Sequence, residues 1–195
     1  MRTRLALILS LTTLLGACAG SAPALNYYVL GGRETPRSVP VDENLPALVV
    51  ESVTLAEFLE QSGLVLQQGA YQLQVSRTHL WAENLDVAVP EVLLMSLQQA
   101  SPDYRYFLRG RDFVPGANYS LRLHFDAFHA TDGGDVLASG RYQVVDTEAN
   151  REIMNRQFNF TEDLQRDGYP QVVSQLRSLL QQLANNIVSE LQTAR

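Results

Sequence analysis

Only one cysteine and no lysine occur among the 195 residues, and each scarcity excludes a class of protein. With Cys18 alone, neither an intramolecular disulfide nor a cysteine-based zinc site can form. Every basic residue is arginine, and the formal charge of −6 at pH 7 disfavours a nucleic-acid-binding protein. The chain also lacks the polybasic segment through which some proteins bind anionic headgroups. We therefore predict no nucleic acid partner.

Motifs for catalysis are also missing. The chain has no G-x-S-x-G elbow, no P-loop and no G-x-G-x-x-G turn. His124 and His129 are five residues apart on a predicted strand, so regular pleating places them on opposite faces, where they cannot share a metal without a bulge. His79 precedes Glu83 but has no third group to complete an acid–base site. We predict a non-enzymatic protein without cofactor or metal.

The N-terminus has the pattern of a bacterial lipoprotein leader. Arg2 and Arg4 precede an apolar run from Leu5 to Leu15, which has the length of a secretory h-region and is too short to span a membrane. Leu15-Gly16-Ala17-Cys18 then matches a lipobox, in which the Cys18 thiol forms a thioether to diacylglycerol and the amine freed by cleavage takes a further acyl chain. The alternative is an ordinary signal peptide followed by a chance cysteine. We predict a signal peptide at 1–17, a lipidated tether at 18–25 and one domain at 26–195.

The residue after the cysteine predicts the target membrane. Position 19 is Ala, whereas Asp at this position signals inner-membrane retention in enteric-type bacteria. We therefore predict sorting to the outer membrane, with the domain on the periplasmic face and acyl chains as the anchor.

The first half of the domain shows a strand, a hairpin and a helix. Residues 26–30 are β-prone, and residues 47–53 form a continuous apolar run typical of a strand buried on both faces. Residues 64–68 and 71–76 flank a glycine and predict a hairpin. A helix is expected over 86–99, with Asp86 as its cap and Pro90 in its first turn.

The second half predicts a meander and a long helix. In "NYSLRLHFDAF", Tyr119, Leu121, Leu123, Phe125 and Ala127 alternate with polar residues and are expected on one face. Two more strands follow, over 136–146 and 153–160. Residues 166–192 close the chain as an amphipathic helix, whose apolar positions are expected to pack on the sheet: Val172, Val173, Leu176, Leu179, Leu180, Leu183, Ile187, Val188 and Leu191. This order predicts a single-domain α/β sandwich with a mixed sheet.

Several segments together resemble the PqiC/YmbA family of ABC-type transport auxiliary lipoproteins. They are the lipobox, "NYYVL", "PALVVESVTLAEFLEQSGLVLQ" and "VSRTHLWAENLDVAVPEVLLMSLQQ". The resemblance implies a three-layer α/β sandwich and a non-catalytic lipoprotein of the outer membrane, whose partners are MCE-domain proteins that move phospholipid across the periplasm. Trp81, Glu83 and Leu85 match the family's "WAE-L" signature. The signature alone does not say whether these residues dock a partner or stabilise the fold.

Two functions remain open from the sequence, while a periplasmic hydrolase is disfavoured by the missing catalytic groups. The first is an accessory subunit, as a possible homo-oligomer, that docks an MCE-type tunnel at the outer membrane and supports envelope integrity. The alternative is a periplasmic lipid-binding carrier, which would need a cavity for an acyl chain. The aromatic residues that could line a core, a subunit interface or a lipid-facing surface are Tyr27, Tyr28, Trp81, Tyr104, Tyr106 and Phe107.

Overall fold

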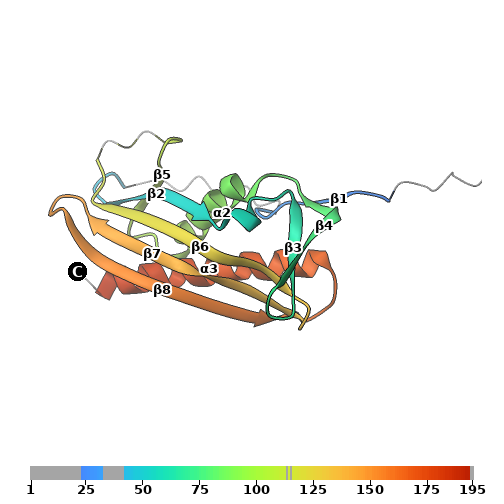
Figure 1. Cartoon of the computed structure of the whole chain (residues 1–195). Coiled ribbons are helices and arrows are strands. Elements are labelled where there is room, and N and C mark those ends of the chain that lie inside the picture. Colours follow the sequence, from blue (N-terminus) through green and yellow to red (C-terminus); the bar gives the residue numbers. More distant parts are fainter. Residues whose placement is uncertain (1–22, 33–41, 113, 115, 194–195) are drawn as a thin grey trace, which may run out of the picture.

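The computed structural model describes residues 23–32, 42–112, 114 and 116–193 (Figure 1). Cys18, the signal peptide and most of the predicted tether lie outside these residues. The elements are β1 (Asn26–Tyr28), β2 (Ala47–Leu55), η2 (Glu57–Leu59), β3 (Gly63–Gln68), β4 (Gln72–Trp81), α2 (Leu85–Ala100), β5 (Arg105–Leu108), β6 (Tyr119–Thr131), β7 (Asp135–Asp146), β8 (Arg151–Asp163) and α3 (Tyr169–Thr193).

The eight strands form one mixed sheet built around β6. On one side, β6 pairs with β7, which pairs with β8, both antiparallel. On its other side, β6 has two parallel neighbours. Its first half pairs with β2, and its C-terminal end pairs with β3. β5 extends the sheet beyond β2, and β4 and β1 extend it beyond β3. The meander and the β3–β4 hairpin predicted from the sequence are confirmed.

The predicted burial of β2 on both faces is correct only for its first half. Ala47 to Val50 are buried where β2 runs between β5 and β6. β5 ends at Leu108, opposite Val50, so the rest of β2 has a neighbour on one side only. Beyond that point Ser52 is exposed and Val53 is half-buried.

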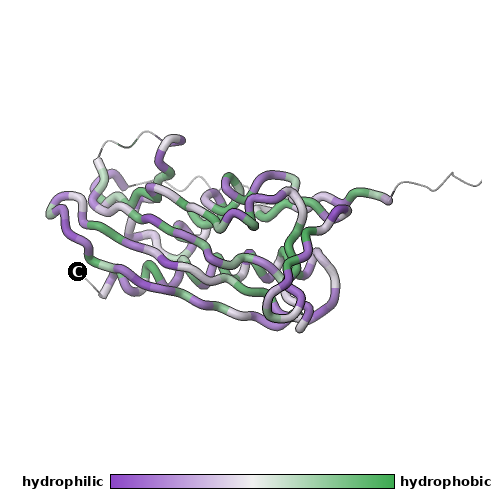
Figure 2. Tube along the Cα trace, in the orientation of Figure 1, coloured by the Kyte–Doolittle hydropathy of each residue, from purple (hydrophilic) through white to green (hydrophobic). Residues whose placement is uncertain are grey.

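The two α-helices lie on the same face of the sheet. α3 contacts β6, β7 and β8, while α2 contacts β2, β5 and α3. All nine apolar positions predicted for the closing helix are buried, and Pro170 is its second residue. Burying nine such side chains contributes about 10–20 kcal/mol before chain entropy is subtracted. Figure 2 shows hydrophobic and hydrophilic residues alternating along the meander strands, as expected for strands packed on one face.

The α/β class, the mixed sheet, the single domain and the long C-terminal helix are as predicted. The resemblance implied three layers. The helices and the sheet form two extensive layers, and among the described elements the far face of the sheet is covered locally by η2, where Phe58 contacts the ring of His129.

The start of α2 differs from the prediction. The helix begins at Leu85, with Asn84 in the cap position, and the Asp86 side chain lies inside the first turn rather than at the cap. Pro90 is the sixth helical residue, beyond the first turn. Because proline has no N–H, the carbonyl of Asp86 loses its usual partner four residues on.

β6 also departs from the predicted alternation. Its register to β7 shifts between Phe125 and Ala127, so Asp126 is an extra residue in a bulge. Phe128 and Ala130 therefore point into the core, and Ala127, predicted to do so, lies on the opposite face.

The bulge also changes the relative placement of two histidines. His124 pairs with Arg141 and His129 with Leu137, so both lie on the same face, four positions apart along β7. Four strand steps are about 13 Å, too far for a shared metal. The described residues contain no group of three His, Cys, Asp or Glu residues that could hold a metal ion.

Candidate docking surface

The three residues of the "WAE-L" signature lie where β4 ends and α2 begins. Trp81 is the last residue of β4, pairs with Tyr28 of β1 and is 7% exposed. Its backbone N–H donates to the carbonyl of Ser62 at 2.7 Å. Leu85, the first residue of α2, is buried in the same core, whereas Glu83 between them is exposed. Trp81 and Leu85 therefore contribute to packing, and of the three only Glu83 is exposed to solvent.

An exposed apolar surface lies beside this signature. Of seven large hydrophobic residues that are exposed in the described chain, six belong to β1, β4 and their adjoining loops. We call them the β1–β4 apolar surface: Leu25, Tyr27, Val29, Tyr71, Leu73 and Val75. Clustered exposed apolar side chains of this kind mark contact sites on protein surfaces.

Strand pairing places most of this surface on one face of the sheet. Tyr27 pairs with Leu80, which pairs with Gly63, and two residues further along β3 Val65 pairs with Val75. Paired residues, and residues two apart on one strand, share a face. Tyr27 and Val75 therefore point the same way. Val75 and Leu80 are five positions apart on β4, which in a regular strand would place them on opposite faces, but the register of β3 and β4 shifts between these pairs.

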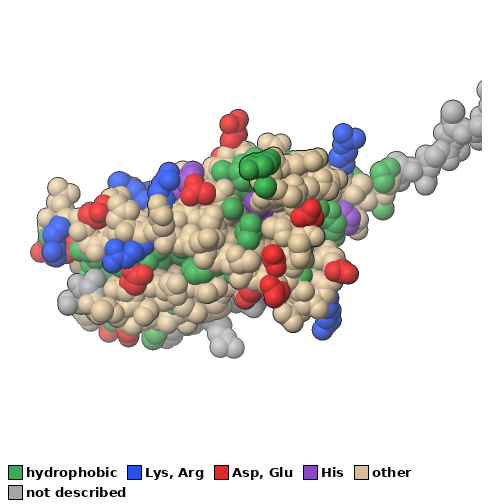
Figure 3. Space-filling view, turned by 60° about the horizontal axis from the view of Figure 1, so that its bottom comes forward, with side chains coloured by type: hydrophobic (Ala, Val, Ile, Leu, Met, Phe, Trp, Pro, Cys, Tyr) green, Lys and Arg blue, Asp and Glu red, His purple; other side chains and the backbone are tan. Residues whose placement is uncertain are grey.

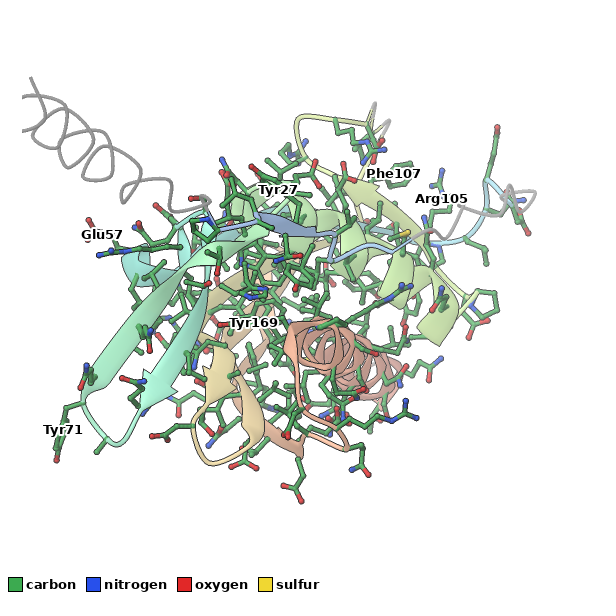
Figure 4. The ribbon with its side chains drawn as sticks, turned by 90° about the vertical axis from the view of Figure 1, so that its right-hand side faces the viewer. Tyr27, Glu57, Tyr71, Arg105, Phe107 and Tyr169 are labelled. Atoms are coloured by element: carbon green, nitrogen blue, oxygen red, sulfur yellow. The ribbon has the colours of Figure 1, made fainter. Side chains whose placement is uncertain are left out.

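The figures locate the surface relative to the N-terminus. Figure 3 shows hydrophobic side chains beside the point where the N-terminal segment leaves the domain. In Figure 4, Tyr27 lies on β1 near that point, and Tyr71 projects from the tip of the β3–β4 hairpin. Tyr71 is fully exposed, at 101%. The β1–β4 apolar surface thus begins where the predicted lipid tether would join the domain.

A cluster of three rings attaches this region to the long helix. The Tyr28 hydroxyl lies 2.8 Å from Nδ1 of His79, which joins β1 to β4. The His79 ring stacks on Tyr169, the first residue of α3, with centroids 3.7 Å apart and planes 12° from parallel. Burial, and secondarily the neighbouring Tyr169, raises the pKa of Tyr28 above its ordinary value, so the phenol stays neutral. The cluster therefore links β1 and β4 to the start of α3.

The backbone shortly after β1 is fixed to α3 as well. Nη1 of Arg177 donates to the carbonyl of Gly31 at 3.1 Å. Gly32 adopts a left-handed φ of 64°, and a Cβ there would lie 2.7 Å from Arg177. Gly31 and Gly32, shortly after β1, are therefore held against α3.

Of the aromatic residues singled out in the sequence, Tyr27 alone is exposed. Tyr104, Tyr106 and Trp81 are buried, and Tyr28 and Phe107 are half-buried. Tyr71 was not predicted as a surface contact. Its position directly after Gly69-Ala70, at the turn of a predicted hairpin, is the sequence signal that indicates a tip residue. No described helix is long and apolar enough to cross a membrane.

Comparisons with known proteins agree with this architecture. The chain is 23% identical over 177 residues to the intermembrane transport lipoprotein PqiC of Escherichia coli strain K12, covering 91% of each chain. A crystal structure of an uncharacterized protein superposes with a TM-score of 0.71 at 24% identity, covering 86% of this chain and 99% of the other. A Xanthomonas campestris protein superposes with a TM-score of 0.64 at 15% identity, covering 84% and 92%. These two structures share the fold.

The family model described as the ABC-type transport auxiliary lipoprotein component matches residues 28–188, which is most of the chain and includes the "WAE-L" signature. The chain therefore belongs to the family of ABC-type transport auxiliary lipoprotein components.

Proposed function

We propose that this protein is a non-catalytic accessory subunit of an MCE-type intermembrane phospholipid transport system, anchored to the outer membrane through Cys18. In this role it docks the periplasmic tunnel at the membrane and supports envelope integrity. The observation that carries the proposal is the gathering of exposed apolar side chains on β1 and β4, next to the point where the lipidated tether would enter.

The tether limits how far this surface can lie from the membrane. Five residues, 18–22, separate the start of the mature chain from the first described residue, Pro23. A fully extended chain spans at most about 3.5 Å per residue, so these residues reach about 17 Å. Acylation at Cys18 would therefore hold β1 close to the bilayer. Several acyl chains anchor firmly, whereas one alone binds only marginally.

The docking contact is assigned to the exposed part of the signature and its apolar neighbours. Glu83 is exposed between two buried residues, so its backbone is fixed by the core while its carboxylate is free to contact a partner. The β1–β4 apolar surface supplies area that becomes buried on contact, which is the main favourable term in association. The partner that this surface would contact is an MCE-domain protein or a second copy of this chain.

The relatives support a role in transport rather than in catalysis. The family is described as auxiliary to ABC-type transport, and the Escherichia coli relative is named as an intermembrane transport lipoprotein. A subunit of this kind acts by holding the transport tunnel in place at the membrane. Its deletion is then expected to cause a large envelope defect, while single polar substitutions cause little.

The test is a crosslinking pull-down of the tagged full-length protein from cells, analysed by mass spectrometry. We expect recovery of an MCE-domain protein and its loss in Cys18→Ser, because the unlipidated chain is released from the membrane. Cys18→Ser must still be present in the soluble periplasmic fraction for the comparison to hold. Recovery of unrelated envelope proteins only, or a histidine or carboxylate variant as defective as the deletion, would contradict the proposal.

A further inference from the structure

A polar hollow lies on the face of the sheet that the helices do not cover. It spans β2, β6, β7 and β8 and has a volume of about 330 Å³. The polar side chains that line it are supplied by Ser52, Thr54, Arg122, His124, Arg141, Gln143 and Asn155. Figure 3 shows arginine side chains gathered beside a histidine on this face.

Strand register brings the two arginines together. Arg122 of β6 pairs with Gln143 of β7, and His124, two residues further along β6, pairs with Arg141. Arg122 and Arg141 are therefore diagonal neighbours on one face, at a separation within reach of two long side chains. β2 adds hydroxyl groups beside them, because Ser52 pairs with Arg122 and Thr54 with His124. All these groups stand on paired strands of a rigid sheet.

Neither arginine of this hollow forms an ion pair within the described chain. The ion pairs formed by arginines there involve Arg109, Arg111 and Arg156, and neither Arg122 nor Arg141 pairs with a described carboxylate. Two like charges on adjacent strands repel each other, and an anion bound between the two guanidinium groups would relieve that repulsion. Two neighbouring arginines on one face contrast with the chain as a whole, whose formal charge is −6.

Two carboxylates border the hollow, and both have other partners. Asp126 lies 3.3 Å from Nε2 of His124. Glu152 accepts hydrogen bonds from the side-chain amides of Gln143 and Asn155. Thr54 is oriented by His124, with its hydroxyl 2.8 Å from Nδ1 of the ring. The guanidinium groups remain available to a ligand.

We propose that this hollow binds a phosphate group, of the kind carried by a glycerophosphate headgroup. Guanidinium groups bind phosphate oxygens through paired, charge-assisted hydrogen bonds, and the hydroxyl of Ser52 and the amide of Asn155 add neutral donors. Strand register fixes the backbone positions of the two arginines on one sheet, unlike the flexible polybasic segment that the sequence lacks. This site goes beyond the docking role and does not depend on Cys18.

The test measures binding of sn-glycerol 3-phosphate to the mature chain carrying Cys18→Ser, so that no acyl chain contributes. The test variant is R122Q/R141Q and the matched control is R77Q/R166Q, which removes the same charge from exposed arginines outside the hollow. We expect the test variant to lose affinity about tenfold or more and the control to change less than about twofold. Equal losses in both variants, or no binding by the unaltered chain, would overturn the proposal.

Two further measurements identify the source of the phosphate and guard against misfolding. Vesicles containing phosphatidylglycerol should lose binding in R122Q/R141Q if the ligand is a lipid headgroup, whereas loss for glycerol 3-phosphate alone indicates a soluble phosphate ester. Amide chemical shifts of the unaltered chain should respond to glycerol 3-phosphate around Ser52, Arg122 and Arg141. Responses confined to other parts of the sheet would contradict the site even if the variant did not fold.

Discussion

The hydroxyl of Tyr28 lies 2.8 Å from Nδ1 of His79, and the same imidazole ring stacks on Tyr169 at 3.7 Å. These contacts join the edge strand β1, the hairpin strand β4 and the start of α3. The strands that carry the exposed apolar side chains are thus joined to the largest helix of the domain, although they are far from it in sequence.

His79→Ala should loosen this connection. It removes both the hydrogen bond and the ring stacking, and we expect the free energy of unfolding to fall by about 1–2 kcal/mol in urea titrations. Tyr28→Phe keeps the ring and should cost about 0.5–1.5 kcal/mol. Arg77→Ala, an exposed change on the same strand, is the control, with an effect within about 0.5 kcal/mol. A loss in His79→Ala no larger than in this control would show that the ring cluster contributes nothing.

Gly140→Ala should be strongly destabilising because of the bulge in β6. A Cβ at position 140 would lie 2.0 Å from the carbonyl oxygen of His124 and 3.0 Å from Cα of Phe125. Backbone atoms cannot give way as a flexible side chain does, so we expect a cost of about 1–3 kcal/mol, measured by thermal or urea unfolding. Gly116→Ala is the control, since nothing lies within 4 Å of its Cβ position. Equal stabilities of the two variants would contradict the bulge.

Asp163→Asn should stabilise the protein at neutral pH. Asp135 and Asp163 pair directly across β7 and β8. A hydrogen bond with Asp163, then burial and charge repulsion, raises the pKa of Asp135 above its ordinary value. The stability gained from the bound proton is present at low pH and is lost as pH rises through the raised pKa. The melting temperature of Asp163→Asn should therefore exceed that of the natural chain at pH 7, and the gap should narrow toward pH 3.

The matched control for that change is Asp167→Asn, in the exposed connection before α3. It removes the same charge without touching Asp135. An equal gain in both variants would indicate a general effect of net charge rather than the carboxylate pair.

His129 should make the protein less stable in mild acid. Burial lowers the pKa of His129, against the opposing effect of its hydrogen bond to the carbonyl of Ala130 at 3.0 Å. The folded state therefore binds fewer protons than the unfolded chain. The stabilisation of the folded state that comes from a neutral His129 is fully present above the ordinary histidine pKa of about 6.5, and it is lost as pH falls below that value. Unfolding midpoints between pH 7 and 5 should fall less steeply in His129→Gln, and an unchanged slope would contradict this role.

The long helix was predictable because its pattern repeats over many turns. Nine apolar residues at spacings of three and four leave one arrangement that buries them all, and the structure buries every one. The alternation of β6 was predictable only as far as Phe125. Whether a bulge follows depends on the close approach of Gly140 from the next strand, which the sequence of β6 cannot reveal.

The candidate docking surface was harder to predict because exposure depends on tertiary neighbours. In "NYYVL", Tyr27 and Tyr28 have the same chemistry, yet Tyr28 is held by His79 and Tyr169 while Tyr27 is 61% exposed. Likewise, the pattern around Trp81 identified a family signature but did not show that Trp81 faces the core. Both outcomes follow from the pairing of β1 with β4: Tyr28 and Trp81 are partners on the face that packs on the core, and Tyr27 lies on the opposite face.

Site-specific photocrosslinking in cells tests the central claim most directly. A photoreactive amino acid would replace Glu83, beside the β1–β4 apolar surface, and in a control chain Asn186, on the exposed side of α3. Both chains must reach the envelope in equal amount and carry the lipid anchor. We predict a covalent adduct with an MCE-domain protein from position 83 and none from position 186. An adduct from position 186 only, or from neither position, would contradict docking through this part of the molecule.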